Sequence, residues 1–395
     1  MPLPSSALFA VAAVPALASL GYIVCCLIVA YRWRRRPSVP MPAHFGPVTI
    51  LKPVCGLEPN LEVNLRSFCE QDYPADVQVI IGAATADDPA LEIARRVKAS
   101  LPNRDITILT GSYALGSNRK VNTLARMYPT ARYDLIVISD SDILVGPTYL
   151  QHIVATLADR SVGIVTCVYR GAPTKSLWSR LGALAQDEWY IPSVLVANAF
   201  GSEAYCGGAT MALRRDVFDA IGAFEALAPY LADDYELGAQ VRRLGLRSIV
   251  SRYEPTVTVD ERGLRGLVAH ELRWMRTIRT VQPYGHAFLF ITFGLPMTLL
   301  ATPFLWPLAG AWALTFPALS ILLRATLHYV LRDRPNPDME AGLPLFRYTR
   351  GSIWLLPIRD MLSFIVWAAS FASRRVIWRQ QALRVHADGV LSGAD

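Results

Sequence analysis

Long apolar runs stand at both ends of the chain, and a mixed pattern lies between them. The first run covers residues 8–30, and residues 1–31 contain no charged side chain. About 20 apolar residues suffice for a helix to cross the hydrocarbon core of a bilayer. The basic segment RWRRR follows at residues 32–36. We therefore expect residues 1–36 to form a transmembrane anchor and its basic flank. By the positive-inside rule, the flank and the chain after it lie in the cytosol.

A cleaved signal peptide is the alternative interpretation of this first run. A signal peptide carries its charges before the apolar stretch and a small-residue cleavage site after it. Here the charges follow the stretch, and no such site comes next. The order of charges therefore favours the anchor.

The second apolar block opens the C-terminal membrane segments, which we place at residues 281–372. Residues 281–323 contain no Asp, Glu, Lys or Arg and are interrupted by Pro296, Pro303, Pro307 and Pro317. This length predicts a hairpin of two spanning helices. A third apolar stretch, residues 354–371, contains Arg359 and Asp360. Charges at membrane depth are costly, so we expect both to pair or to face protein or water.

The tail at residues 373–395 is also basic, with arginines at positions 374, 375, 379 and 384. The positive-inside rule places such a tail in the cytosol. Three crossings after a cytosolic domain would instead place it outside. We therefore predict that the third apolar stretch is re-entrant or interfacial.

Between the ends, residues 45–280 alternate short β-branched runs with stretches of helical spacing. Strands are predicted at 48–54, 77–83, 106–109, 135–139 and 162–168, and helices at 58–70, 89–100, 120–127 and 147–157. This alternation predicts an α/β domain with a mainly parallel sheet. In such sheets ligands bind at the carboxyl ends of the strands.

Composition fits this division of the chain. Of 395 residues, 52% are hydrophobic and 18% are charged, and the mean hydropathy is +0.29. These values exclude a disordered chain and a small disulfide scaffold. The six cysteines show no metal-like spacing, so we expect reduced thiols and no zinc site. The net charge of +7 comes largely from arginines that flank the membrane segments, so nucleic acid is not an expected partner.

Asp140-Ser141-Asp142 follows directly after the apolar strand predicted at residues 135–139. Two carboxylates at such an edge can ligate one hard divalent cation that keeps open positions. The cation can bridge a diphosphate and offset the charge that builds as it leaves. A simple turn is the alternative, because Asp and Ser are common turn residues.

Two other strand ends carry candidate nucleotide ligands. Asp87 and Asp88 follow the second strand, and Asp88 could accept hydrogen bonds from a base or ribose or could cap the next helix. Asn118 and Lys120 lie in a loop that suits phosphate binding or is merely a solvated basic loop.

Asp233 and Asp234 open a later helical stretch. Adjacent carboxylates repel, which raises one pKa and suits proton abstraction from an alcohol; acid enrichment at a helix N-terminus is the alternative. Further on, Arg273, Arg276 and Arg279 share a helix face beside the membrane. That face could bind lipid head groups or diphosphate, or could serve as a plain interfacial anchor.

Taken in order, these elements resemble the ceramide glucosyltransferase family of membrane-bound GT-A glycosyltransferases. The family has an Asp after the second strand, a D-x-D-like strand end, a third Asp, and a (Q/R)-x-x-R-W motif before C-terminal membrane segments. The counterparts here are Asp88, Asp140, Asp234 and Arg273-Trp274, with His270 in place of the Gln or Arg. The resemblance extends over residues 51–379. Residues 67–74 and 118–120 look closer to the bacterial branch associated with hopanoid biosynthesis.

The resemblance implies a role for each matching residue. Asp140, with Asp142, would hold Mg²⁺ or Mn²⁺ against the diphosphate. Asp234, with Asp233 beside it, would supply the base that deprotonates the acceptor hydroxyl. Arg273 and Trp274 would close on the diphosphate and the acceptor. The remaining residues of the nucleotide-sugar site would be Asp87, Asp88, Asn118, Lys120 and His270, with Asp88 on the uridine.

The expected function is therefore inverting, metal-dependent transfer of a hexose or N-acetylhexosamine from a UDP-sugar to the hydroxyl of a membrane lipid. Ceramide and a hopanoid polyol such as bacteriohopanetetrol are the candidate acceptors. The expected location is a bacterial inner membrane, with the catalytic domain on the cytosolic face. The alternatives are a processive polysaccharide synthase, a polyprenyl-phosphate glycosyltransferase, and a non-catalytic lipid-binding scaffold.

Overall fold

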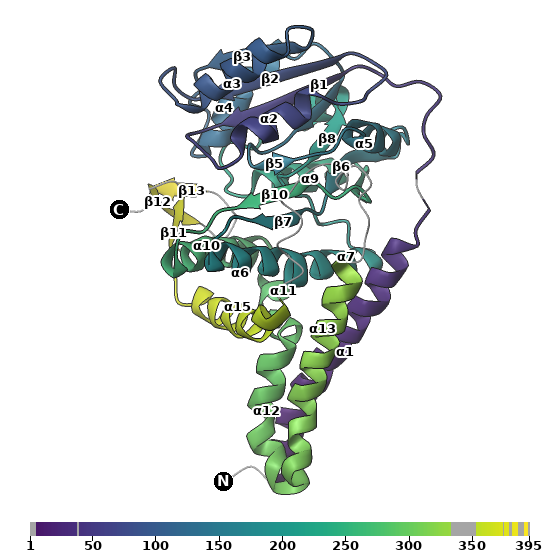
Figure 1. The fold of residues 1–395 in the computed structure, drawn as a ribbon, viewed down its shortest axis with the longest axis vertical. Helices are drawn as coiled ribbons and strands as arrows, with labels where there is room; N and C mark the ends of the chain where they lie inside the picture. The colour runs from purple at the N-terminus through teal and green to yellow at the C-terminus, as the bar shows by residue number, and fades with distance from the viewer. Residues whose placement is uncertain are drawn as a thin grey trace.

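A mixed α/β domain stands on a bundle of three long helices (Figure 1). The computed structural model describes residues 5–37, 39–332, 353–373, 375–378, 381–385 and 391–393. Side chains are described for 12–37, 39–331 and 353–373.

The large sheet has seven strands, and the five strands predicted from the sequence are all among them. They are β1 (Val48–Val54), β2 (Val77–Ala83), β3 (Asp105–Thr110), β4 (Leu135–Ile138), β6 (Val162–Cys167), β8 (Met211–Arg214) and β9 (Arg247–Ser251). Their order is β3-β2-β1-β4-β8-β6-β9. Strand β8 is antiparallel to both neighbours, and the other pairs are parallel. The predicted α/β class with a mainly parallel sheet is confirmed.

Helices cover both faces of this sheet. They are α2 (Leu61–Cys69), α3 (Ala90–Ser100), α4 (Arg119–Met127), α5 (Tyr149–Leu157), α8 (Arg215–Ala220) and α9 (Asp233–Arg243). Ile50 of β1 packs in the core that contains α2, α3 and α5, whereas Leu51 packs in the core that contains α4, α8 and α9. Successive side chains of a strand point to opposite faces, so an unbroken apolar run fits a sheet buried on both sides.

A small second sheet lies between the large sheet and the membrane-side helices (Figure 1). Its order is β5 (Ile143–Leu144), β10 (Thr256–Val259) and β7 (Arg170–Pro173). The helical elements below it are α6 (Leu177–Ala185), the π-helix η2 (Gln186–Tyr190), α7 (Ile191–Ala199) and α10 (Leu264–Val281). The sequence did not predict this sheet, because strands of two to four residues are too short to show a period.

The bundle consists of α1 (Ser5–Arg34), α12 (Gly294–Ala309) and α13 (Thr315–Arg332), with η4 (Gly310–Leu314) joining the last two. Ala13 and Ala16 of α1 pack against Ala301 and Leu305 of α12. The hairpin of α12 and α13 begins at Gly294, later than the predicted start of the apolar block at residue 281. The short helices α11 (Pro283–Ala287) and η3 (Phe288–Thr292) come first. Segments long and apolar enough to cross a bilayer are Ala12–Arg34, Gly294–Leu331 and Ile353–Ser370.

The third apolar segment does not run along the bundle. After η6 (Ile353–Leu355), helix α15 (Leu356–Ser370) lies across the bundle's upper end, below α10 (Figure 1). Its charged residues are buried and paired as expected, Arg359 with Glu271 of α10 and Asp360 with Arg324 of α13.

The described parts of the tail form an antiparallel sheet of β11 (Arg375–Trp378), β12 (Gln381–Val385) and β13 (Leu391–Gly393). Positions 374 and 379, two of the four arginines of the basic tail, lie outside the described residues.

Gly171 permits the close approach of β7 and α6. A Cβ added at Gly171 would lie 2.7 Å from Cα of Ala183. Because the obstacle is backbone, we expect Gly171→Ala to destabilise the protein by about 1–3 kcal/mol. Thermal unfolding in detergent would show this as a lower midpoint. The control is Gly285→Ala, whose added Cβ would meet only Gln282, at 3.7 Å. Equal midpoints for the two variants would contradict the prediction.

Candidate active site

A cavity of about 960 Å³ opens at the carboxyl ends of β1 and β4 and extends to helix α10. Strand ends, the first turns of α4 and α9, and the segment after β10 form its walls. Its polar lining includes Glu58, Arg119, Lys120, Asp140, Asp142, Asp233, Asp234, Glu261, His270, Glu271, Arg273 and Trp274. The position agrees with the rule that open α/β sheets bind ligands at this edge.

Gly208 lies between the carboxylates of Asp140 and Asp234. Its backbone N–H donates to Oδ2 of Asp234 at 2.9 Å. A Cβ added at Gly208 would lie 2.7 Å from Oδ2 of Asp140. The two carboxylates, 94 residues apart in the sequence, therefore flank a single backbone position.

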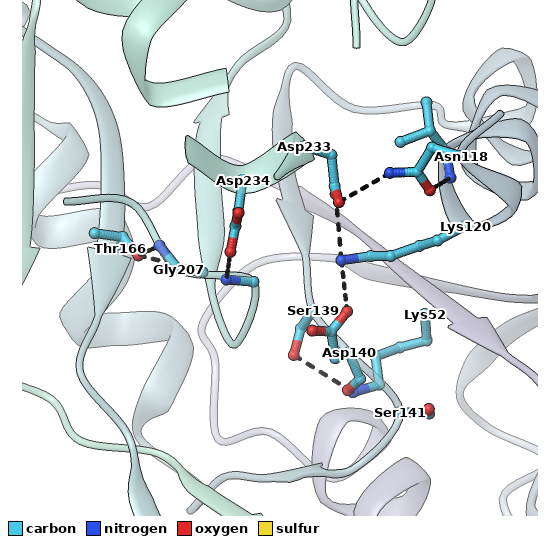
Figure 2. A network of polar contacts seen from close by, with 12 residues as sticks. Lys52, Asn118, Lys120, Ser139, Asp140, Ser141, Thr166, Gly207, Asp233 and Asp234 are labelled. Atoms are coloured by element: carbon cyan, nitrogen blue, oxygen red, sulfur yellow. Dashed lines mark hydrogen bonds and ion pairs between the residues drawn. The ribbon is translucent and has the colours of Figure 1, made fainter. Parts of the chain in front are cut away.

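Gly208 reaches this position because β8 runs against its neighbours. The start of an antiparallel strand lies at the same edge as the ends of β4 and β6. The preceding Gly207 is held by its N–H, which donates to Oγ1 of Thr166 at 3.0 Å (Figure 2). Sequence reasoning missed Gly208, and the Gly207-Gly208 pair was the only signal for it.

Lys120 lies between Asp140 and Asp233 (Figure 2). Its Nζ is 2.7 Å from Oδ1 of Asp140 and 3.4 Å from Oδ2 of Asp233. Burial by itself lowers the pKa of this ammonium, but Asp140 and Asp233 outweigh burial and hold the pKa above its usual value. Lys120 therefore carries a positive charge between the carboxylates of Asp140 and Asp233.

Asn118 holds the side chain of Asp233 in place. Its Nδ2 donates to Oδ1 of Asp233 at 3.2 Å and to the carbonyl oxygen of Tyr230 at 2.9 Å. Its Oδ1 accepts from N of Val121 and so caps α4. The buried Asn118 is not among the described residues that line the cavity, so in this structure it orients Asp233 from behind.

Asp233 and Asp234 have different surroundings. Both oxygens of Asp233 are taken by Asn118 and Lys120. Asp234 accepts hydrogen bonds from two backbone N–H groups, that of Gly208 at 2.9 Å and that of Tyr235 at 2.7 Å. Burial and the charge of Asp233 raise the pKa of Asp234 to about 6, against the opposing effect of Lys120. A pKa near neutrality suits Asp234 to the role of general base.

Lys52 supports the D-x-D turn from below. This fully buried residue of β1 donates from Nζ to the carbonyl oxygen of Asp140 and to Oγ of Ser139 at 3.4 Å. Its Nζ also lies 3.8 Å from the ring centroid of Phe68. Burial lowers the pKa of Lys52 to about 7, although Asp140 and Asp142 oppose this. Its one signal in the sequence was a charge inside an apolar strand.

Carboxylates are concentrated around Asp142. Burial and the charges of Asp140 and Glu58 raise the pKa of Asp142 to about 7. Glu58, which sequence reasoning also missed, accepts from Oγ of Ser141 at 2.6 Å. Oxygen ligands suit Mg²⁺ or Mn²⁺, and a cation would relieve the repulsion that raises this pKa, so the residues fit a divalent ion. No group of three or more metal-ligating side chains was found among the residues that the structure describes, so other ligands would have to complete the shell.

Asp88 holds the loop that follows β1. Its Oδ1 accepts from N of Gly56 and N of Ala90, both at 2.9 Å. Asp88 thus caps α3 as the alternative interpretation expected, and it also fixes Gly56, which has a φ of 72°. Neighbouring Cys55 lines the cavity, whereas neither Asp87 nor Asp88 is among its described lining residues. Asp87 is exposed, and a hydrogen bond from Thr85 lowers its pKa.

The membrane-side wall of the cavity is formed by α10. His270 contacts Oε1 of Glu261 through Nδ1 at 2.7 Å. The ring of Trp274 meets that of His270 edge-on, with centroids 4.6 Å apart. Both aromatic residues and Arg273 line the cavity, so the predicted R-W pair and the D-x-D turn line the same cavity.

Comparison with solved structures finds the same fold in a mannosyltransferase, PcManGT from Pyrobaculum calidifontis, solved in complex with GDP-Man and Mn²⁺. The match has a TM-score of 0.51 and 22% sequence identity, and it covers 91% of this chain and 98% of that one. This similarity confirms the GT-A fold.

Curated relatives are ceramide glucosyltransferases. The Komagataella phaffii enzyme is 33% identical over 140 residues, which is 33% of this chain and 27% of that protein. Caenorhabditis elegans ceramide glucosyltransferase 1 is 26% identical over 235 residues, 59% of this chain and 50% of the worm protein. The Pyricularia oryzae enzyme is 23% identical over 93% of this chain and 92% of its own length. The first two matches thus span half or less of those relatives.

The model of the family described as glycosyl transferase family 21 matches residues 11–391, which include most of α1, the cavity residues and the C-terminal helices. The chain belongs to glycosyl transferase family 21.

Proposed function

We propose that this protein transfers a hexose or N-acetylhexosamine from a UDP-sugar to the hydroxyl of a membrane lipid, with inversion at the anomeric carbon. The observation that carries the proposal is the placement of Asp140 and Asp234 on either side of Gly208, in a cavity that reaches the membrane-side helix α10. The relatives named ceramide glucosyltransferase support a lipid acceptor. The GDP-Man and Mn²⁺ bound to PcManGT support a nucleotide-sugar donor and a divalent ion.

The donor would bind at the D-x-D side of the cavity. Asp140 and Asp142 would hold Mg²⁺ or Mn²⁺, with Lys120 beside them and the uridine towards the Asp88 loop. When bound, the ion offsets the charge that builds on the leaving diphosphate. Lys52 keeps the turn in place through the Asp140 carbonyl oxygen, and Lys120 adds a second positive charge.

The acceptor would meet the donor at Asp234. Its carboxylate takes the hydroxyl proton as the acceptor oxygen bonds to the anomeric carbon and the bond from that carbon to the diphosphate breaks. One base and one displacement give inversion. Asp233 would act by holding Lys120, not as the base. From α10, Arg273 would close on the diphosphate and Trp274 on the acceptor, with His270 beside them.

Helices on both flanks would hold the cavity beside the bilayer, where a lipid acceptor is already concentrated and oriented. We assign residues 1–36 to the anchor, 45–280 to the GT-A domain, 281–372 to the membrane segments and 373–395 to the tail. The arginines at 32–36 support the cytosolic face. The resemblance of residues 67–74 and 118–120 to the bacterial branch supports a bacterial inner membrane. Ceramide and a hopanoid polyol both present the hydroxyl that Asp234 requires.

Asp234→Asn tests the base. Purified protein given UDP-glucose or UDP-GlcNAc and a lipid acceptor should release UDP when Mg²⁺ or Mn²⁺ is present and stop when it is chelated. The variant should lower turnover by about 10²–10⁴-fold, because an amide cannot take the proton, while calorimetry shows nearly unchanged donor binding. The control is Asp134→Asn, a carboxylate that is 92% exposed.

Turnover that survives in Asp234→Asn would refute the assignment of the base. A wild-type protein that binds no UDP with Mn²⁺ would favour the lipid-binding scaffold. A polymeric product would favour the polysaccharide synthase. Transfer to polyprenyl phosphate would favour the polyprenyl-phosphate glycosyltransferase.

The pH profile tests the pKa of Asp234. This carboxylate must be ionised to accept a proton, and its pKa is raised to about 6. At saturating metal, which favours ionised Asp142, kcat/KM should be flat above that value. Below it, the rate should fall by about tenfold per pH unit. An acidic limb centred near the ordinary pKa of Asp, about 4, would contradict the assignment.

Gly208→Ala tests the shared backbone position. The new Cβ would lie 2.7 Å from Oδ2 of Asp140 and 3.4 Å from Nζ of Lys120, so the carboxylate must move. We expect kcat/KM to fall by about 10²-fold with little change in unfolding temperature. The control is Gly46→Ala, whose Cβ would meet Leu135 at an ordinary 3.6 Å. Wild-type kinetics in Gly208→Ala would show that the site tolerates the displacement.

A further inference from the structure

Helix α15 carries two adjacent residues of opposite charge, Arg359 and Asp360, and both are buried. Arg359 forms a two-point ion pair with Glu271 of α10, with Nη1 2.6 Å from Oε1 and Nη2 2.8 Å from Oε2. Its Nε donates to Oγ of Ser363 at 3.0 Å, and Nη1 also reaches the carbonyl oxygen of Leu181 in α6 at 3.3 Å. The guanidinium is thus bonded to three helices.

Asp360 makes the matching pair on the other side. Its Oδ1 lies 2.8 Å from Nη2 of Arg324, and its Oδ2 accepts from Nε at 3.1 Å. Arg324 belongs to α13 and donates from Nη1 to the carbonyl oxygen of Glu188 at 2.7 Å. His328, one turn further along α13, contacts the Glu188 carboxylate at 2.7 Å. One turn of α15 therefore connects the active-site helix α10 with the membrane helix α13.

The geometry has a mechanical consequence for the cavity. Glu271 lines the cavity and lies between His270 and Arg273 on α10, with Trp274 one turn away. A two-point Arg–carboxylate pair fixes orientation as well as distance. The pair is buried, so a rotation of α10 would strand a charge away from water, which is strongly unfavourable. The rotational setting of Arg273 and Trp274 is therefore tied to α15.

We propose that Arg359 is a positioning residue for the acceptor side of the site. With Asp360 it fixes α10 against α13, so that the acceptor meets Trp274 at a set depth relative to the membrane helices. The part that concerns the acceptor rests on the proposed transferase function. The part that concerns the setting of α10 does not.

Arg359→Lys tests the inference, since it keeps the charge and loses the two-point geometry. The control is Arg214→Lys, a buried arginine of β8 that donates to the carbonyl oxygens of Leu157 and Arg160, far from α10 in the sequence and outside the cavity lining. Hydrogen exchange of the full-length protein in detergent reports the setting of α10 directly. We expect amides of residues 264–281 to exchange about tenfold faster in Arg359→Lys, with β1 and β2 unchanged. Arg214→Lys should leave α10 at the wild-type rate.

Kinetics separate positioning from general stability. Arg359→Lys should raise KM for the lipid acceptor by about tenfold. KM for the UDP-sugar should rise by less, about threefold at most, because Arg273 is only one of the residues proposed to hold the donor. Combined with Trp274→Phe, it should lower kcat/KM by less than the product of the two single effects, because both act through Trp274.

Wild-type exchange in α10, or loss of protection spread equally over β1 and β2, would overturn the proposal. Equal changes in both KM values would do the same. If the wild-type protein itself shows no transfer, the proposed function fails, while the exchange result still decides whether Arg359 sets α10.

Discussion

The site depends on the ion pairs of the Lys120 ammonium group. This group joins Asp140, in the turn after β4, to Asp233, which begins α9, and it comes from the first turn of α4. Asp140, Asp142, Asp233 and Asp234 would repel one another strongly without a positive charge among them. Lys120 lets the carboxylates share one cavity before any ligand arrives.

The C-terminal half of the protein places charged residues in segments that are long and apolar enough to cross a bilayer. On α15 the charged residues face inwards and are paired, whereas Ile358, Met361 and Ile365 are exposed. This pattern is the reverse of a water-soluble amphipathic helix and fits a helix whose outer face meets apolar surroundings. The helix can therefore connect α10 to the bundle without exposing an unpaired charge.

The sequence predicted the parts of the protein that have strong local patterns. The bounds of β1 and β2 were correct to the residue, because both are unbroken apolar runs bounded by polar turns. Asp140 and Asp234 could be foreseen because their motifs stand next to recognisable elements. Strand β8 could not, since its four residues carry no period and its direction depends on its neighbours. The sequence also did not reveal Gly208, Glu58 or the support from Lys52, because their positions depend on contacts between distant segments. The link from Asp88 to Gly56 depends on such a contact as well.

The packing of α1 against α12 and α13 constrains how the protein is made. Ile23 lies so close to Gly294 that a Cβ there would approach its Cδ1 to 2.5 Å, and Cys26 and Ala30 pack with Leu327 and Leu331. Translation delivers α1 some 260 residues before α12 begins. The whole α/β domain is therefore made before the partners of this face of α1 exist. The bundle can therefore be completed only after residues 294–331 have been made.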